Sequence, residues 1–575
     1  MPMGKNPCKS VKSPGTARFL RRFAGCIAAV VFYCGTHASP LYAISSPGKE
    51  YFDIVKSIDL LGEVYREISQ GYVDKVNVSE LMYAGIDGML HTLDQYTVFL
   101  DEDASKDFGE QTSGQYPGVG ISIAGLEENV FVTSIVDGYP ASKAGIRVGD
   151  RIDSINNTKL KGLTLEKVRE LIRGPVGSSL EVRIERKGAP LFIAKLVREE
   201  IRLNSVTYFG LIDGIGYIEM KSFGSHSAED LREAYEGLKR EAAEKHSILK
   251  GLVLDLRHNP GGLLTVAVDV TSLFVKKGSE VVSIKGRTPD TYKSYATANP
   301  PIDTVLPLAV LINSETASAA EIVSGAIQDL DRGVLIGERS FGKGLVQSIL
   351  RISYDHILKM TTSKYYTPSG RLIQKESEPG SESRKVLTRT AGENASKVFY
   401  TKGKRKVYGG GGITPDIEMN ETASSPYLSE LRKKGMIFLF SSDIRSANAV
   451  MPSQPFDRKS LMTSFNDFLR TRKFVYKTEP EQRLTDLRES IERVQKGKDK
   501  AELKSLDGVQ QEIGHLREME LARESDKITD ALEVEILRHY NEHDARRVEL
   551  GHDPVFTKAV EILSDRKKYS SLLHL

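Results

Sequence analysis

Two residues in neighbouring segments of the chain have the types needed for nucleophilic chemistry. Ser318 stands in "TASAAEI", where an apolar run gives way to a predicted helix, and Lys343 stands in "SFGKGLVQ" between two apolar runs. A serine hydroxyl is a weak nucleophile until an adjacent base removes its proton. A lysine amine becomes such a base when burial among apolar groups lowers its pKa from ~10.4 to about 7. The pair is therefore a candidate for acyl transfer, with Ser318 as the nucleophile and Lys343 as the base.

Each of the two residues also has an ordinary structural explanation. Serine is a preferred residue at the N-terminal cap of a helix, and Ser318 is only a cap if no base lies near it. Lys343, flanked by glycines, is then a solvated loop lysine, as most lysines are. The histidines offer no clear alternative base, because none of them has a clear partner and the chain has no serine motif such as GxSxG beside one.

Further groups could complete such a site. Gln347, four residues after the lysine, can hold the amine by a hydrogen bond without adding a charge that would keep it protonated. Gly261 and Gly262, in "RHNPGG", allow backbone N–H groups to approach a ligand oxygen closely. With the N–H of Ala319 they could form an oxyanion hole, whose loss typically costs about 3–4 kcal/mol of barrier.

The elements that must position these residues are strands and helices in alternation. After Ile201 the apolar runs "GIGYIEM", "GLVLDLR", "LAVLIN" and "GVLIGE" are separated by predicted helices, which favours an α/β core with partly parallel strands. Residues just past the ends of parallel strands gather at one edge of a sheet. Ser318 follows "LAVLIN" and Lys343 follows "GVLIGE", so we expect both at that edge.

The rest of the chain divides by its texture. Residues 44–110 carry a helical apolar repeat, and residues 111–200 alternate strand-like runs with glycine turns, as in a compact β-rich module. Residues 201–421 hold the α/β pattern. Residues 422–575 are charged and helical, with a coiled-coil-like repeat at Leu484, Leu487, Ile491 and Val494. The role of this last region stays open between dimerisation, docking of an adaptor and bracing of the core.

The first 43 residues have the form of an export signal. Basic residues precede the apolar stretch "FAGCIAAVVFYCG", and small residues follow it. The apolar run is shorter than the ~20 residues that span a bilayer, although an uncleaved anchor remains the alternative. All three cysteines lie in this leader, so the rest of the chain has neither a disulfide framework nor a thiol nucleophile. We expect a periplasmic protein, with attachment to the inner membrane through an uncleaved N-terminal segment as the alternative.

Charge and motifs exclude other classes of function. Without the basic leader the net charge is small and negative, which gives no electrostatic case for nucleic acid. The pattern "HYNEH", from His539 to His543, matches H-x-x-E-H on a predicted helix. Its surroundings are highly charged and lack a clear third ligand, so we interpret it as a solvated helix face. No metal and no cofactor are expected.

The three motifs "RHNPGG", "TASAAEI" and "SFGKGLVQ", in this order and spacing, resemble those of the carboxyl-terminal processing, or tail-specific, proteases. Supporting matches are "LDQYTVFL", "KYYTPSGRLIQ" and "GGGGITPDIEM". The resemblance implies a multidomain protein with a crotonase- and ClpP-like α/β protease core, an inserted PDZ domain, an N-terminal helical segment and a C-terminal helical extension. The PDZ carboxylate-binding loop would be "YPGVGI", which comprises Tyr116, Pro117, Gly118, Val119, Gly120 and Ile121.

The resemblance implies a role for each site residue. Ser318 attacks the scissile carbonyl, Lys343 takes and returns the proton, and Gln347 completes the dyad. The N–H groups of Ala319 and of Gly262 or Gly261 hold the oxyanion. The PDZ domain captures the free C-termini of protein substrates, in processing or degradation of exported proteins. An adaptor protein and a homodimer are further partners to consider.

The sequence differs from the family pattern at two places, and two other functions are considered for it. Ala320 stands where a second serine is common, and "LDQY" replaces the more usual "LDPHS", which we place outside the chemistry. The main rival is a non-catalytic PDZ scaffold on a protease-like fold. A crotonase-like acyl-transfer enzyme is the second, but it does not explain the PDZ-like segment.

Overall fold

The structure is a computed structural model that describes residues 47–375, 397–421, 424–495 and 501–574. The predicted export signal lies outside these ranges. Two compact units, Met1–Met82 and Tyr83–Leu575, are described separately. Among the helices within the described ranges, none is both long and apolar enough to cross a membrane.

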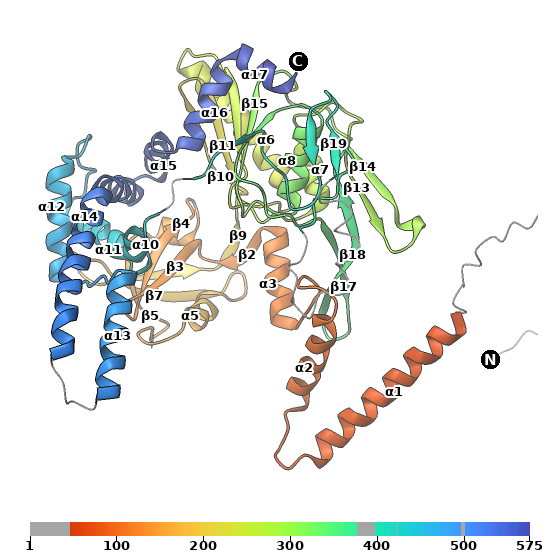
Figure 1. Ribbon diagram of the computed structural model, residues 1–575, viewed down its shortest axis with the longest axis horizontal. Helices are drawn as coiled ribbons and strands as arrows, with labels where there is room; N and C mark the ends of the chain where they lie inside the picture. The colour runs from red at the N-terminus through yellow and green to blue at the C-terminus, as the bar shows by residue number, and fades with distance from the viewer. Residues whose placement is uncertain (1–46, 376–396, 422–423, 496–500, 575) are drawn as a thin grey trace, which may run out of the picture. The chain divides into compact units, whose positions relative to one another are not determined.

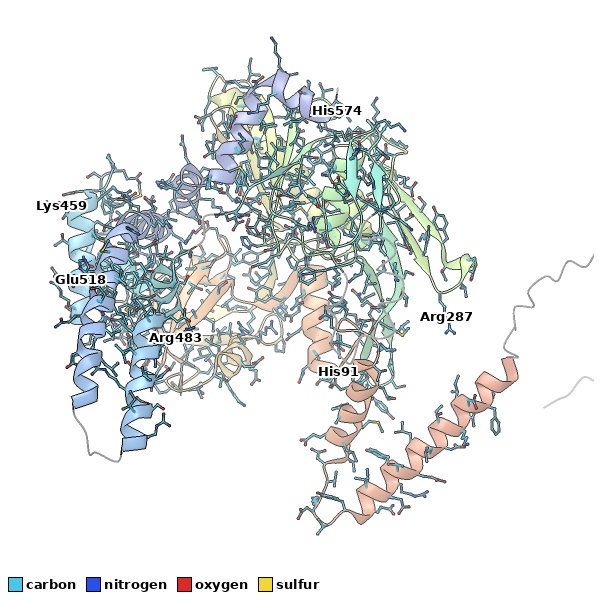
Figure 2. All side chains as sticks on the ribbon, in the orientation of Figure 1. His91, Arg287, Lys459, Arg483, Glu518 and His574 are labelled. Atoms are coloured by element: carbon cyan, nitrogen blue, oxygen red, sulfur yellow. The ribbon has the colours of Figure 1, made fainter. Side chains whose placement is uncertain are left out.

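In the first unit, the predicted apolar repeat forms a single long helix, α1 (Pro47–Gly71). The start of α2 (Val78–His91) follows it. Tyr51, Ile58 and Leu61 recur on α1 with helical spacing, and each is about half exposed or more. The sticks of Figure 2 show the side chains of α1 standing out along the helix. The helix therefore carries an apolar stripe that the first unit itself does not cover.

A six-stranded sheet forms the centre of the second unit (Figure 1). All neighbouring pairs are parallel except β10 with β11. In spatial order the strands are β10 (Val206–Ile212), β11 (Ile215–Met220), β12 (Gly251–Asp255), β15 (Leu308–Ile312), β16 (Val334–Gly337) and β21 (Ile417–Glu418). The predicted α/β core is confirmed, and its four middle strands are buried along their whole length.

The two faces of this sheet are covered by helices from different parts of the chain. Alternate residues such as Leu252, Val310 and Leu335 pack on one face against α6 (Ser227–Glu244), α7 (Leu264–Ser272) and α8 (Ala319–Asp329). Their neighbours along the strands pack on the other face against the last helices, α16 (Pro554–Ser564) and α17 (Arg566–Leu573). The sequence left the role of the C-terminal region open between dimerisation, docking of an adaptor and bracing of the core. Helices α16 and α17 brace the core, because they pack on the central sheet.

A second sheet lies beside the lysine of the predicted dyad. Its long strand β18 (Ile357–Tyr366) pairs with β17 (Leu345–Arg351), which begins two residues after Lys343. It also pairs with β1 (Val98–Leu100) and β13 (Glu280–Gly286), and β13 pairs with β14 (Lys293–Ala296). The serine and the lysine thus border two different sheets.

The PDZ-like segment contains a sheet of its own, and two paired strands connect it to the core. Its entry strand β2 (Gln115–Gly118) and its exit strand β9 (Glu199–Arg202) pair antiparallel. Between them, β3 (Ile121–Leu126) is the edge strand of a sheet in the order β3-β4-β5-β7-β8. Its other elements are β4 (Asn129–Ile135), α4 (Pro140–Lys143), β5 (Arg151–Ile155), β6 (Thr158–Lys159), α5 (Leu165–Ile172), β7 (Ser179–Glu185) and β8 (Phe192–Val197).

The C-terminal helices before the brace form a bundle with its own apolar core. Leu126 and Phe131 of the PDZ-like sheet pack against it. Its helices are α10 (Pro426–Lys433), α11 (Met436–Ala447), α12 (Arg458–Thr471), α13 (Glu479–Gln495), α14 (Ala501–Arg538) and α15 (Glu542–Gly551). The labelled Arg483 lies on α13 and Glu518 on α14 (Figure 2). The remaining elements are α3 (Glu102–Ser113), η1 (Pro289–Thr291), β19 (Val398–Tyr400) and β20 (Lys406–Tyr408).

The interpretation of "HYNEH" as a solvated face of one helix is wrong. Helix α14 ends at Arg538, and Asn541 caps the start of α15, so the pattern spans a break between two helices. His539 is buried, and its Nε2 hydrogen-bonds Ser442 Oγ at 2.9 Å. His543 instead packs against the ring of Tyr208. The two imidazoles therefore have separate packing partners.

Candidate active site

Ser318 lies at a strained turn between a buried strand and a buried helix. It follows β15 and stands at the N-cap position of α8, with φ 55° and ψ −116°. A non-glycine residue rarely adopts such a conformation, and the strain must be held by its surroundings. All of α8 is buried, whereas Ser318 itself is half-buried between two alanines. The turn presents a small, accessible hydroxyl on a rigid support.

Glu321 binds the serine turn and the lysine loop at the same time. Its Oε2 accepts the N–H of Ser318 at 2.8 Å and that of Lys343 at 2.9 Å. Its Oε1 accepts the Ser340 hydroxyl at 2.6 Å and the Gly342 N–H at 2.7 Å. Burial raises the pKa of Glu321 to about 7, against the effect of these four hydrogen bonds, which favour the carboxylate.

Tyr365 makes a second link between the same two segments. Its hydroxyl, on β18, donates to the carbonyl oxygens of Ser318, at 3.1 Å, and of Lys343. One carboxylate and one phenol thus hold the backbones of the predicted nucleophile and base side by side, through donors and acceptors of both residues. The structure brings Ser318 and Lys343 together at the edge of the sheet, as the strand order predicted.

The amine of Lys343 is half-buried and lies over an aromatic ring. Its Nζ is 4.7 Å from the centre of the Tyr96 ring. The pKa of Lys343 is lowered to about 8, mainly by burial and to a smaller extent by the positive charge of Lys359. The carboxylates of Glu321 and Asp94 act in the opposite direction. A substantial fraction of this amine is therefore neutral near pH 8, as a general base requires.

Gln347 lies on β17, close to the lysine in sequence but engaged elsewhere. Its Nε2 donates to Thr361 Oγ1 on the neighbouring strand at 3.3 Å. Among the hydrogen bonds of the described residues, none joins this amide to Lys343. Its role as the third member of the dyad therefore stays a prediction.

The predicted oxyanion groups gather around Ser318, but they are not equivalent. A Cβ on Gly261 would lie 2.8 Å from Ser318 Cβ and 2.8 Å from the Ala319 nitrogen, so this glycine packs directly on the serine turn. The Gly261 N–H donates to Asn259 Oδ1 and is engaged within its own loop. Within the described residues we find no acceptor for the N–H groups of Gly262 and Ala319. The N–H groups of Gly262 and Ala319 are therefore the better candidates for oxyanion donors, and this role stays a prediction.

The predicted carboxylate-binding loop of the PDZ-like segment is partly strand. Tyr116, Pro117 and Gly118 belong to β2, while Val119 and Gly120 form the turn into the edge strand β3. Gly120 has φ 79°, and its carbonyl accepts the Val136 N–H. A loop that leads into a free strand edge is the arrangement that peptide recognition by strand addition requires.

Sequence reasoning missed three residues of the site. Glu321 was detectable, because it stands three residues after Ser318 in an S-x-x-E capping pattern. Tyr365, in "KYYTPSG", had no local signal of its contact. The motif "LDQY" was placed outside the chemistry from the sequence, but its Tyr96 lies over the amine of Lys343.

Comparisons with known proteins identify counterparts for the domains of the chain. Three family models match the chain: "Peptidase family S41" over residues 214–382, "PDZ domain" over residues 131–186, and "Probable PDZ-protease, C-terminal helical domain" over residues 427–563. The α/β core, the PDZ-like sheet and the C-terminal helices therefore each have a counterpart.

Individual relatives are similar to more than half of the chain. A carboxy-terminal-processing protease of Bartonella bacilliformis is 38% identical over 323 residues, which are 56% of this chain and 73% of that protein. The carboxy-terminal processing protease CtpA of Bacillus subtilis is 31% identical over 319 residues, 55% of this chain and 67% of that protein. Among solved structures, the photosystem II D1 C-terminal processing protease is 28% identical, covers 63% of this chain and 92% of its own, and has a TM-score of 0.33.

The fold and these similarities define a serine peptidase whose α/β core carries a PDZ domain and a C-terminal helical domain. The chain belongs to peptidase family S41, among the carboxy-terminal processing proteases.

Proposed function

We propose that this peptidase cleaves its substrates through an acyl-enzyme formed by Ser318 and Lys343. The lone pair of Lys343 Nζ takes the proton of Ser318 Oγ as that oxygen bonds to the scissile carbonyl carbon. The carbonyl oxygen becomes an anion, which the N–H groups of Gly262 and Ala319 and the N-terminus of α8 stabilise. The C–N bond then breaks, the ammonium gives its proton to the leaving amine, and water hydrolyses the ester.

One observation carries this proposal. The carboxylate of Glu321 and the hydroxyl of Tyr365 each bind the backbones of both Ser318 and Lys343. A loop lysine with no chemical task does not need to be held in this way against a strained serine turn.

The test is cleavage of an unfolded protein substrate with apolar C-terminal residues. We expect Ser318→Ala and Lys343→Ala to lose nearly all activity, by more than about 10³-fold, because each removes one half of the proton transfer. Ser314→Ala and Lys277→Ala, which change exposed residues, serve as matched controls. Cleavage that survives in both dyad variants would refute the proposed roles.

We further propose that the PDZ domain recognises the free C-terminus of the substrate. The support is the edge strand β3, preceded by the Val119–Gly120 turn and adjacent to α5. A substrate strand can add to this edge while the turn N–H groups bind its carboxylate. Amidation of the substrate C-terminus should raise KM with little change in kcat. Equal kinetics for the acid and the amide would remove this role from the PDZ domain.

The proposed compartment is the periplasm, with substrates among exported proteins. The support is the leader within residues 1–43, in which basic, apolar and small residues follow one another. Cell fractionation of the full chain and of a chain without this leader tests the proposal. Recovery of both forms in the cytoplasm would contradict it.

We propose a homodimer as the oligomeric state, formed through the apolar stripe of α1. Tyr51, Ile58 and Leu61 are 70%, 63% and 48% exposed, and such a stripe on a 25-residue helix is typical of a helix with a partner. Light scattering should give twice the chain mass, and the single mass for the double variant Ile58→Glu, Leu61→Glu. If both samples have the single mass, an adaptor protein becomes the better candidate for this surface.

A further inference from the structure

A short turn before β1 places an aromatic side chain on the amine of the dyad. Asp94 closes this turn: its Oδ1 accepts the N–H of Tyr96 at 2.7 Å and that of Thr97 at 2.8 Å. Its Oδ2 accepts the Thr97 hydroxyl at 3.0 Å. Three hydrogen bonds to one carboxylate hold the backbone of this turn, and with it the position from which the Tyr96 side chain extends.

The same turn is tied to the strand that binds Gln347. The N–H of Thr361, on β18, donates to Thr97 Oγ1 at 3.1 Å, and Thr361 Oγ1 accepts the Gln347 amide. Strand β1 continues from the turn and pairs with β18, with Val98 opposite Lys359. The turn is thus attached to the second sheet, and the lysine loop leads into β17 of the same sheet.

The ring of Tyr96 meets the reactive end of Lys343. Nζ lies 4.7 Å from the ring centre, within the range in which a ring face attracts an ammonium. The ring also occupies space that water would otherwise fill beside the amine. Both effects act on the atom that must take a proton from Ser318 and later return it.

We propose that Tyr96 is a positioning residue for catalysis, whose ring holds Lys343 Nζ beside Ser318, keeps water from the amine and stabilises the ammonium formed in the acylation step. The proposal rests on the proposed dyad. A simple packing role would affect folding alone, whereas this role acts on the protonation of one amine.

Other charged groups around the amine also change the pKa of Lys343. The charge of Lys359 disfavours the ammonium, and the carboxylates of Glu321 and Asp94 favour it. The Tyr365 hydroxyl donates to the backbone carbonyls of Ser318 and Lys343. Substitutions at Tyr96 leave all four of these groups in the chain, so a change in titration reports on the ring.

The first experiment compares Tyr96→Phe with Tyr96→Ala in the full chain, by the pH dependence of kcat/KM. Only the neutral amine accepts a proton, so activity rises with pH through the pKa of Lys343. Alanine removes the attraction of the ring for the ammonium, which lowers the pKa of Lys343, and it also admits water, which raises this pKa. Because burial is the largest influence on this pKa, we expect the second effect to dominate and to move the rise to higher pH by about one unit, which lowers kcat/KM at pH 7 by about tenfold. Phenylalanine keeps the ring and should stay within about twofold of the wild type.

The second experiment measures the amine without catalysis. In the Ser318→Ala protein, the pH dependence of acylation of Lys343 by an amine-reactive reagent, read by peptide mass spectrometry, gives its pKa. Tyr96→Ala in that background should shift this curve upward and Tyr96→Phe should not, with equal melting temperatures for the folded variants.

The outcomes separate the two proposals. Wild-type kinetics and an unshifted labelling curve for Tyr96→Ala would overturn the role of the ring, while the dyad would stand if Ser318→Ala and Lys343→Ala are inactive. Activity that persists in those two variants would overturn the dyad instead. An equal loss of activity in Tyr96→Phe and Tyr96→Ala would assign the effect to the hydroxyl and also contradict the proposal.

Discussion

The proposed nucleophile and the proposed base are held by two regions of very different character. The serine turn lies between β15 and α8, both buried along their whole length, and its conformation is fixed by the backbone. The lysine loop leads into β17, whose residues become half-buried and then exposed along the strand. The position of the Ser318 hydroxyl therefore depends on the backbone conformation of its turn, whereas the pKa of Lys343 depends on the side chains around its amine.

The two regions should therefore fail in different ways. Changes near the serine turn should lower activity at every pH, because they move the attacking oxygen or the oxyanion donors. Changes near the lysine should move the pH dependence, because they alter the balance between amine and ammonium.

The largest effect expected after loss of the dyad itself is that of Gly261→Ala. Its φ is 98°, and the new Cβ would lie 2.7 Å from the carbonyl oxygen of Ala317 as well as against Ser318. We expect kcat/KM to fall by about 10³-fold at all pH values, comparable to loss of an oxyanion donor. Gly278→Ala is a matched control, because φ is 86° and no atom lies within 4 Å of its Cβ. Similar kinetics for the two variants would show that the packing of Gly261 on the serine turn is not needed for activity.

Glu321→Gln tests the link that joins the two regions. The amide loses the charge that accepts four hydrogen bonds and turns an NH2 group toward two N–H or O–H donors, at about 1.5–3 kcal/mol for a charged hydrogen bond. We expect a loss of about 100-fold in kcat and a lower melting temperature. Glu244→Gln, on the exposed end of α6, is the control. Full activity with a normal melting temperature would show that the link does not position the dyad.

Gln347 variants ask whether the lysine region needs a neutral partner. Gln347→Ala should lower kcat by about tenfold if the amide orients the amine in the reacting complex. Gln347→Glu adds a negative charge, which favours the ammonium, so the rise of kcat/KM should move to higher pH. Wild-type kinetics in both variants would restrict the amide to its bond with Thr361.

The smallest effect expected is that of Lys359→Gln. Removal of a like charge raises the pKa of Lys343 above about 8, so less of the amine is neutral at pH 7. The rise of kcat/KM should move upward by about half a unit, which lowers activity at pH 7 by about threefold and leaves the plateau at high pH unchanged. Lys364→Gln, on the same strand, is the control. A lower plateau in Lys359→Gln would indicate a role beyond charge.

Much of the site was predictable from the sequence. The alternation of apolar runs and helices indicated parallel strands, and the carboxyl ends of neighbouring parallel strands meet at one edge. Ser318 and Lys343 follow β15 and β16, which pair directly, so their proximity follows from strand order alone. The glycines of "NPGG" were detectable for a similar reason, since only a residue without Cβ can pack on the serine turn.

The sequence alone indicated an alternation of strands and helices with partly parallel strands, and the residue types that follow two of those strands. Three features could be seen only in the folded chain: Tyr96 lies over the amine of Lys343, α16 and α17 cover the second face of the central sheet, and His539 is buried. The physical reason is that apolar periodicity shows which face of an element is buried but not against what. The partner is chosen by long-range packing and by hydrogen bonds such as those of Glu321 and Tyr365, which join segments that are distant in the sequence.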